Sequence, residues 1–171
     1  MQSRRRAYRR LCLSLVLLPA SVSPPERPAT LDVAGTISLT AGPSTGPGRD
    51  AAGRVAYVGG SSGTNRSAGP TAFMDGAATV TADTSTLVDG TGPHHGTITM
   101  SKGADAMLYA WRGQVTTVVD AERRPTSTMA GSWTALRGSG RYAGASGRGT
   151  YTGRFTSSTE SVIEWRGAIS E

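Results

Sequence analysis

Cysteine is almost absent from this chain, because Cys12 is the single cysteine in 171 residues. It lies within residues 1–23, which we predict below to be removed from the mature protein. The mature protein would then be cysteine-free, with no disulfide, no thiol nucleophile and no cysteine-ligated metal. Its stability would have to come from backbone pairing and side-chain packing.

Sequence patterns typical of long helices are also missing. Apolar residues make up only 37% of the chain, and no stretch after residue 30 repeats Leu, Ala, Glu and Lys with a period of 3.6 residues. The 23 glycines separate short threonine-rich segments, a pattern typical of strands joined by turns. Because 171 residues fit one domain, we expect a single all-β domain.

A basic surface is lacking once the first residues are set aside. The net charge of the whole chain is +6, but five arginines lie within residues 1–10. Beyond residue 23 the chain has 13 basic and 12 acidic residues. A domain so close to neutrality has no electrostatic footprint for a phosphate backbone, so we expect no nucleic-acid partner.

The first 23 residues have the order of a secretory signal peptide. Residues 1–10 are strongly basic, residues 11–18 are apolar, and residues 19–23 are small and turn-prone. The apolar core is far shorter than the roughly 20 residues that span a bilayer. We therefore expect cleavage, a secreted or periplasmic protein, and a mature form that is not membrane-integral. The alternative interpretation is a disordered basic tail.

Residues 24–30 contain three prolines and are predicted to form an extended spacer before a folded domain at residues 31–171. Within this domain we predict loops at residues 61–70 and 84–95, where small and polar residues accumulate. Strands are predicted wherever residues alternate with a period of two. They cover residues 31–41, 54–58, 73–83, 97–101, 106–120, 126–136, 148–157 and 161–169.

Each predicted strand has one apolar and one polar face. On 106–120, for example, Met107, Tyr109 and Trp111 share a face, while Arg112 and Gln114 lie opposite. A sheet with one apolar and one wet side buries the apolar side by closing on itself, which also removes its edges. The predicted fold is an all-β, eight-stranded antiparallel up-and-down β-barrel with a lipocalin-like shape. A two-sheet sandwich with crossovers is the alternative.

Glycines and aromatic residues are interleaved from Trp133 to Trp165. We interpret the glycines as tight corners between strands, since glycine accepts positive φ and lets one backbone lie close against another. The stretch Gly138–Gly153, together with Ile98–Gly113 and Glu164–Ile169, resembles the allene oxide cyclase-like barrels, a superfamily that includes the dirigent proteins and many bacterial secreted proteins.

The resemblance implies an eight-stranded barrel with a central apolar cavity that often self-associates, and hence a possible homo-oligomer. Plant members steer the cyclisation or coupling of reactive hydrophobic intermediates, largely by shape. Their functional residues do not map onto this chain, so no catalytic residue is carried over and fold alone does not imply the activity.

Six aromatic residues are the main candidates for a binding site. If they face inward, they form either an ordinary packed core or an aromatic wall around a small hydrophobic ligand. The candidate cavity-lining residues are Tyr109, Trp111, Trp133, Tyr151, Phe155 and Trp165.

Other motifs give weaker support for a catalytic or metal site. Gly59–Gly63 matches the G-x-S-x-G nucleophile elbow, but no helical pattern follows it. His94 and His95 lie in a predicted loop, point apart as chain neighbours, and lack the spacing of a metal site. Either could act as a general base if it reached the barrel mouth.

Two further motifs favour a structural or surface role. Glu160 and Glu164 share a strand face that opposes Trp165, so we expect them on the outer, wet side. Residues 65–67 (NRS) form a glycosylation sequon, which matters only if the source glycosylates secreted proteins. We expect neither a metal nor a cofactor.

Three functional hypotheses follow from the sequence. The first is a binding module for a small apolar molecule. The second is a cofactor-independent cyclase or isomerase, which requires at least one ionisable group inside the barrel. The third is a non-catalytic structural or assembly role.

Overall fold

The computed structural model describes residues 29–44 and 49–170, which form nine strands and one turn of 3-10 helix. The predicted signal peptide and most of the predicted spacer lie outside the described residues. In chain order the elements are β1 (Thr30–Ala41), β2 (Arg54–Gly59), β3 (Ser61–Ser67), β4 (Ala78–Val88), β5 (Gly92–Lys102), β6 (Asp105–Val119), β7 (Pro125–Ser139), η1 (Gly140–Tyr142), β8 (Ser146–Phe155) and β9 (Glu160–Ser170).

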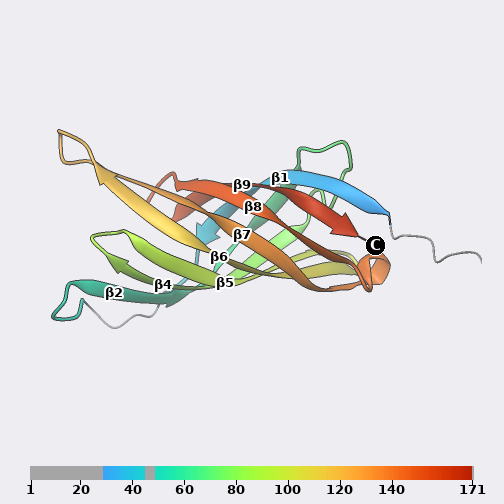
Figure 1. The fold of residues 1–171 in the computed structure, drawn as a ribbon, viewed down its shortest axis with the longest axis horizontal. Coiled ribbons are helices and arrows are strands. Elements are labelled where there is room, and N and C mark those ends of the chain that lie inside the picture. Colours follow the sequence, from blue (N-terminus) through green and yellow to red (C-terminus); the bar gives the residue numbers. More distant parts are fainter. Residues whose placement is uncertain (1–28, 45–48, 171) are drawn as a thin grey trace, which may run out of the picture.

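The strands form one closed barrel (Figure 1). Around the ring the order is β4-β3-β1-β9-β8-β7-β6-β5, and β5 pairs with β4 to complete it. Every pairing is antiparallel. The order follows the chain without the crossovers of a sandwich, so the prediction of an eight-stranded antiparallel up-and-down barrel is confirmed, with β2 as an additional strand.

β2 continues the line of β3 along β4. Gly59 pairs with Asp83 and Ser62 pairs with Val80, so both strands keep the same register on β4. Only Gly60 separates them. β3 corrects the expectation of a loop at residues 61–70, because its small polar residues pair with β1 on one side and β4 on the other.

β2 extends past the end of β1 at Ala41. Among residues 29–44 and 49–170, β2 pairs with β4 alone, so its other edge has no strand partner. At this end the hairpins β4–β5 and β6–β7 also reach far out, as Figure 1 shows on its left side. The barrel is therefore open and uneven at this end.

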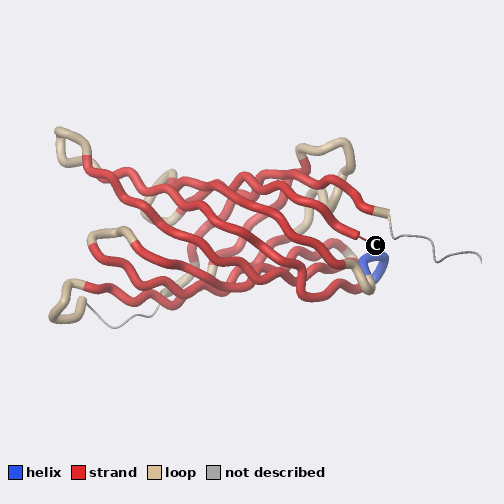
Figure 2. Tube along the Cα trace, in the orientation of Figure 1, coloured by secondary structure: helices blue, strands red, loops and turns tan. Residues whose placement is uncertain are grey.

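The opposite end is closed by the segment between β3 and β4. Phe73 and Met74 of this segment are buried, and the Phe73 ring packs against Tyr142 of η1 with centroids 5.1 Å apart. Figure 2 shows η1 at this end, beside the end of β9. Phe73 was expected at the start of a strand over residues 73–83, but β4 begins only at Ala78 because this preceding segment folds inward.

Asn65 of β3 holds the closing segment in place. Its amide nitrogen donates to the carbonyl oxygens of Phe73 at 3.3 Å and Met74 at 2.9 Å, and its Oδ1 accepts from Nε1 of Trp165 at 2.9 Å. The side chain is fully buried, and these bonds satisfy it. The asparagine of the sequon therefore has a structural role and is not accessible in the folded protein.

Most strand glycines do not form corners but lie under an aromatic side chain, where a Cβ would collide with it. We call such a glycine a seat. In the glycine-rich stretch only Gly140 and Gly144 have positive φ, 62° and 85°, and they lie in the turn between β7 and β8. A Cβ on Gly149 or Gly167 would collide with the Trp133 indole. The corner interpretation is thus correct for two positions, whereas in the strands glycine leaves space that a neighbouring ring fills.

Replacing such a seat should destabilise the barrel. We expect Gly167→Ala to lower the free energy of unfolding by about 2–3 kcal/mol, because its Cβ would overlap the Trp133 ring and the Arg148 carbonyl in a packed wall. Urea unfolding measures the change. Gly69→Ala is the matched control, since its Cβ would have no contact shorter than 3.4 Å, and it should change stability by less than about 1 kcal/mol. Equal effects of the two substitutions would contradict the seat model.

Candidate functional site

The open end of the barrel contains a cavity of about 330 Å³. Its wall is mostly apolar and is built from residues of all nine strands, with Ser158 and Thr159 of the β8–β9 turn at the rim. Apolar residues such as Ile37, Leu39 and Met129 are buried along it. The cavity is therefore formed by the barrel interior itself.

All six predicted aromatic residues line this cavity. The Trp133 ring lies edge-on to Tyr109, with centroids 5.4 Å apart, and edge-on to Trp165 at 6.1 Å. Phe155 lies near the open end of β8 and is 45% exposed. The structure thus brings together the set Tyr109, Trp111, Trp133, Tyr151, Phe155 and Trp165 along the inner wall.

Two polar atoms of this aromatic wall are buried without a hydrogen-bond partner among the described residues. They are the hydroxyl of Tyr109 and Nε1 of Trp133. Burial, together with the nearby Tyr142, raises the pKa of Tyr109 above its ordinary value, so the phenol stays protonated. Both atoms are donors that their immediate surroundings leave unused.

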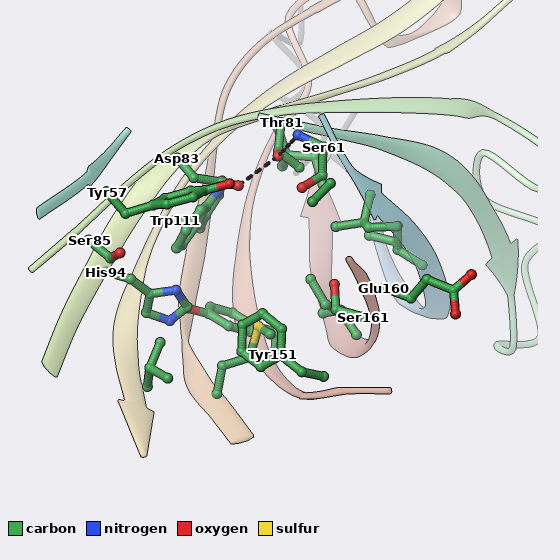
Figure 3. A pocket seen from close by; sticks show the side chains of 18 of the residues that line it. Tyr57, Ser61, Thr81, Asp83, Ser85, His94, Trp111, Tyr151, Glu160 and Ser161 are labelled. Carbon is green, nitrogen blue, oxygen red and sulfur yellow. Dashed lines mark hydrogen bonds between the residues drawn. The ribbon is translucent and has the colours of Figure 1, made fainter. Parts of the chain in front are cut away.

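His94 lies on β5 and lines the cavity, which corrects its predicted place in a loop. The strand extends to Gly92 because residues here pair with both β4 and β6. His94 is buried, whereas His95 is exposed, so the two neighbours point apart as expected. Figure 3 shows His94 beside Tyr151.

The His94 ring is held by two aromatic neighbours. Its Nε2 lies 2.9 Å from the Tyr151 hydroxyl and shares a hydrogen bond with it, and the Trp111 ring lies edge-on with centroids 4.6 Å apart. Burial, with a smaller effect of His95, lowers the pKa of His94 to about 4. At neutral pH this imidazole is therefore uncharged.

Asp83 of β4 is the acidic group inside the cavity. Its Oδ2 accepts a hydrogen bond from the Thr81 hydroxyl at 3.0 Å, and the Thr81 oxygen accepts one from the backbone N–H of Ser61 at 3.0 Å (Figure 3). Burial raises the pKa of Asp83 to about 6, although the bond from Thr81 opposes the shift.

Sequence reasoning missed Asp83 because β4 turns its polar face inward. Thr79 and Thr81 are buried, while Val80 is 58% exposed. The rule that the apolar face of each strand points into the barrel is therefore wrong for β4. The one usable signal was Asp83 itself, in register with Thr79 and Thr81 on the face that the rule assigned to solvent.

The remaining motifs do not form a second site. Ser61 of the elbow-like motif lies at the start of β3 and no helix follows it. Glu164 is exposed as expected, and Glu160 stands at the rim of the cavity. Among the described residues there is no group of three or more side chains that could hold a metal ion, and none of their helices is long and apolar enough to cross a membrane.

The chain was compared with protein families, with curated proteins and with solved structures. No family model, no curated protein and no solved structure matches this chain.

The opposite pKa shifts of Asp83 and His94 predict opposite pH effects on stability. Folding raises the pKa of Asp83 from 3.8 to about 6, so Asp83 lowers stability as pH rises from 4 to 6. Folding lowers the pKa of His94 from 6.5 to about 4, so His94 raises stability as pH rises over the same range.

Single substitutions should separate the two slopes. Asp83→Asn leaves the His94 effect, so its unfolding free energy should rise between pH 4 and 6.5. His94→Gln leaves the Asp83 effect, so its unfolding free energy should fall between pH 4 and 6. Each change should stay below about 3 kcal/mol. Urea unfolding at several pH values tests this, and two variant profiles that run parallel to the wild type would contradict both assignments.

Proposed function

We propose that this barrel binds a small hydrophobic molecule in its interior. The observation that carries the proposal is the cavity of about 330 Å³ lined by the six aromatic residues. Pockets for small molecules are concave, mostly apolar and provided with a few polar groups, and their volumes begin at about 300 Å³. Asp83, His94 and Tyr57 supply such polar groups here.

Core packing alone does not account for the open end. Protein interiors are packed as densely as organic crystals and contain few voids larger than a water molecule. The closed end follows this rule, because Phe73, Met74 and Tyr142 are buried there against one another and Trp165. The contrast between a packed end and a hollow end supports a ligand as the occupant of the hollow.

A cofactor-independent isomerase or cyclase is the second candidate. One observation favours it, namely that the cavity contains an acid, Asp83, with a pKa raised to about 6. A general acid or base works best with a pKa near the working pH. Binding is the first proposal because it requires only the cavity, whereas catalysis also requires a reactive ligand beside Asp83.

The export of this protein and its kinship remain proposals. A signal peptide at residues 1–23 would make the protein secreted or periplasmic, and the resemblance to the allene oxide cyclase-like barrels agrees with the observed ring of strands. Self-association rests on the same resemblance.

Filling the cavity should weaken binding. Val115 of β6 is buried and lines the cavity, so Val115→Phe should weaken the binding of a neutral hydrophobic probe at least about tenfold, which corresponds to about 1.4 kcal/mol. The probe is 1-octanol, and its binding is followed by the fluorescence of the three tryptophans, all of which line the cavity.

The matched control is Val118→Phe on the same strand, because Val118 is 64% exposed and does not line the cavity. It should leave octanol affinity unchanged. An unmodified protein that shows no fluorescence response to octanol or to larger neutral probes would overturn the proposed function.

A further inference from the structure

The cavity wall contains negative charge and no positive charge. Asp83 lies inside it and Glu160 stands at its rim, and none of its lining residues is a lysine or an arginine. The ion pairs among the described residues are formed by other acids, all of them near exposed arginines. The charge of the cavity is therefore not balanced by the part of the chain that the structure describes.

Asp83 is only partly satisfied by its neighbours. The hydrogen bond from Thr81 occupies one side of Oδ2, and an ionised carboxylate can accept several more. Buried charges in proteins are normally paired with an opposite charge, because removing them from water costs free energy that only a partner recovers. Asp83 faces a cavity from which such a partner could come.

The groups around Asp83 supply no positive charge of their own. The other titratable groups that line the cavity are Tyr57 of β2, His94 of β5 and Tyr151 of β8, while Glu160 of β9 lies at the rim (Figure 3). His94 is uncharged at neutral pH because burial lowers its pKa to about 4. Burial and the nearby charge of Asp83 raise the pKa of Tyr151 above its ordinary value, so this group also stays neutral.

Two aromatic rings flank the carboxyl group. Asp83 pairs with Gly59 on one side and with Gly96 on the other. The Tyr57 ring folds over Gly59 and the Trp111 ring lies over Gly96, since a Cβ on either glycine would meet these rings at 2.5 to 2.9 Å. Because both cross-strand neighbours of Asp83 are glycines, the Tyr57 phenol can lie on one side of its carboxyl group and the Trp111 indole on the other.

We propose that the ligand is an apolar molecule carrying a protonated amine, which pairs with the Asp83 carboxylate between the Tyr57 and Trp111 rings. This inference rests on the proposed function, because it assigns a chemical class to the ligand of the same cavity. Aromatic faces attract cations, and the attraction grows when water is excluded. The carboxylate would supply the opposite charge and the apolar wall would hold the hydrocarbon part.

The test compares octylamine, 1-octanol and octanoate, three probes of equal chain length and different head groups. Binding to the full-length protein is measured by tryptophan fluorescence at pH 7.5. Octylamine should bind at least about tenfold more tightly than octanol, and octanoate should bind least because its charge repeats that of Asp83. Asp83→Asn should reduce the ratio of octylamine to octanol affinity to about one, because the amine loses its charge partner.

Two controls make the result specific. Asp89→Asn removes a carboxyl group that is exposed and outside the cavity, and it should preserve the preference for the amine. For the unmodified protein, lowering the pH from 7.5 to 5 should remove the preference, since Asp83 becomes protonated while the amine, with a pKa of about 10, stays charged. This second measurement does not depend on the folding of any variant.

The outcomes separate the two proposals. Octanol binding without a preference for octylamine, or a preference that survives in Asp83→Asn, overturns the amine inference and leaves the proposed function standing. A preference for octanoate also overturns the amine inference, since it indicates a different head group. No binding of any probe overturns the proposed function and this inference with it.

Discussion

The barrel depends on one recurrent contact, in which an aromatic side chain lies over a glycine of a neighbouring strand. The Trp133 indole covers Gly149 and Gly167, and the Tyr151 hydroxyl end covers Gly113 and Gly131. Each ring fills the space that a missing side chain leaves, so it buries apolar area without crossing the interior. Because the rings lie along the wall, the middle of the open end stays empty. The same contact therefore stabilises the sheet and creates the cavity.

The two ends of the barrel differ in packing and in polarity. At the closed end Asn65 binds the segment that carries Phe73 and Met74, and dense packing supplies stability. At the open end the interior holds an acid and an imidazole, whose burial shifts their pKa values in opposite directions. At neutral pH the buried Asp83 carboxylate reduces stability, and proteins commonly retain perturbed acids and bases at functional sites. Dense packing at the closed end therefore contributes stability, whereas the buried carboxylate at the open end reduces it.

The sequence predicted the strands whose inner face is apolar, such as those around Tyr109 and Ile163, and it predicted the six aromatic residues of the wall. It failed where the interior is polar. β3 consists of Ser, Thr, Gly and Asn with one Arg, and alternation cannot distinguish such a strand from a loop. On β4 the same rule put Val80 inside and Asp83 outside, whereas the structure does the reverse. Which face of a short strand points inward is decided by its neighbours around the ring, so Asp83 and His94 emerge only from the closed structure.

The one-sided pairing of β2 has a consequence for the width of the mouth. On the β3 side of Gly60 the ring of strands is complete, because β3 pairs with both β1 and β4. Widening the barrel there would break the backbone hydrogen bonds between two strands. On the β2 side of Gly60 the wall is interrupted, because β2 pairs with β4 alone among the described strands. The part of the rim that carries Tyr57 is therefore held by one ladder of backbone hydrogen bonds, whereas each strand of the complete ring is held by two.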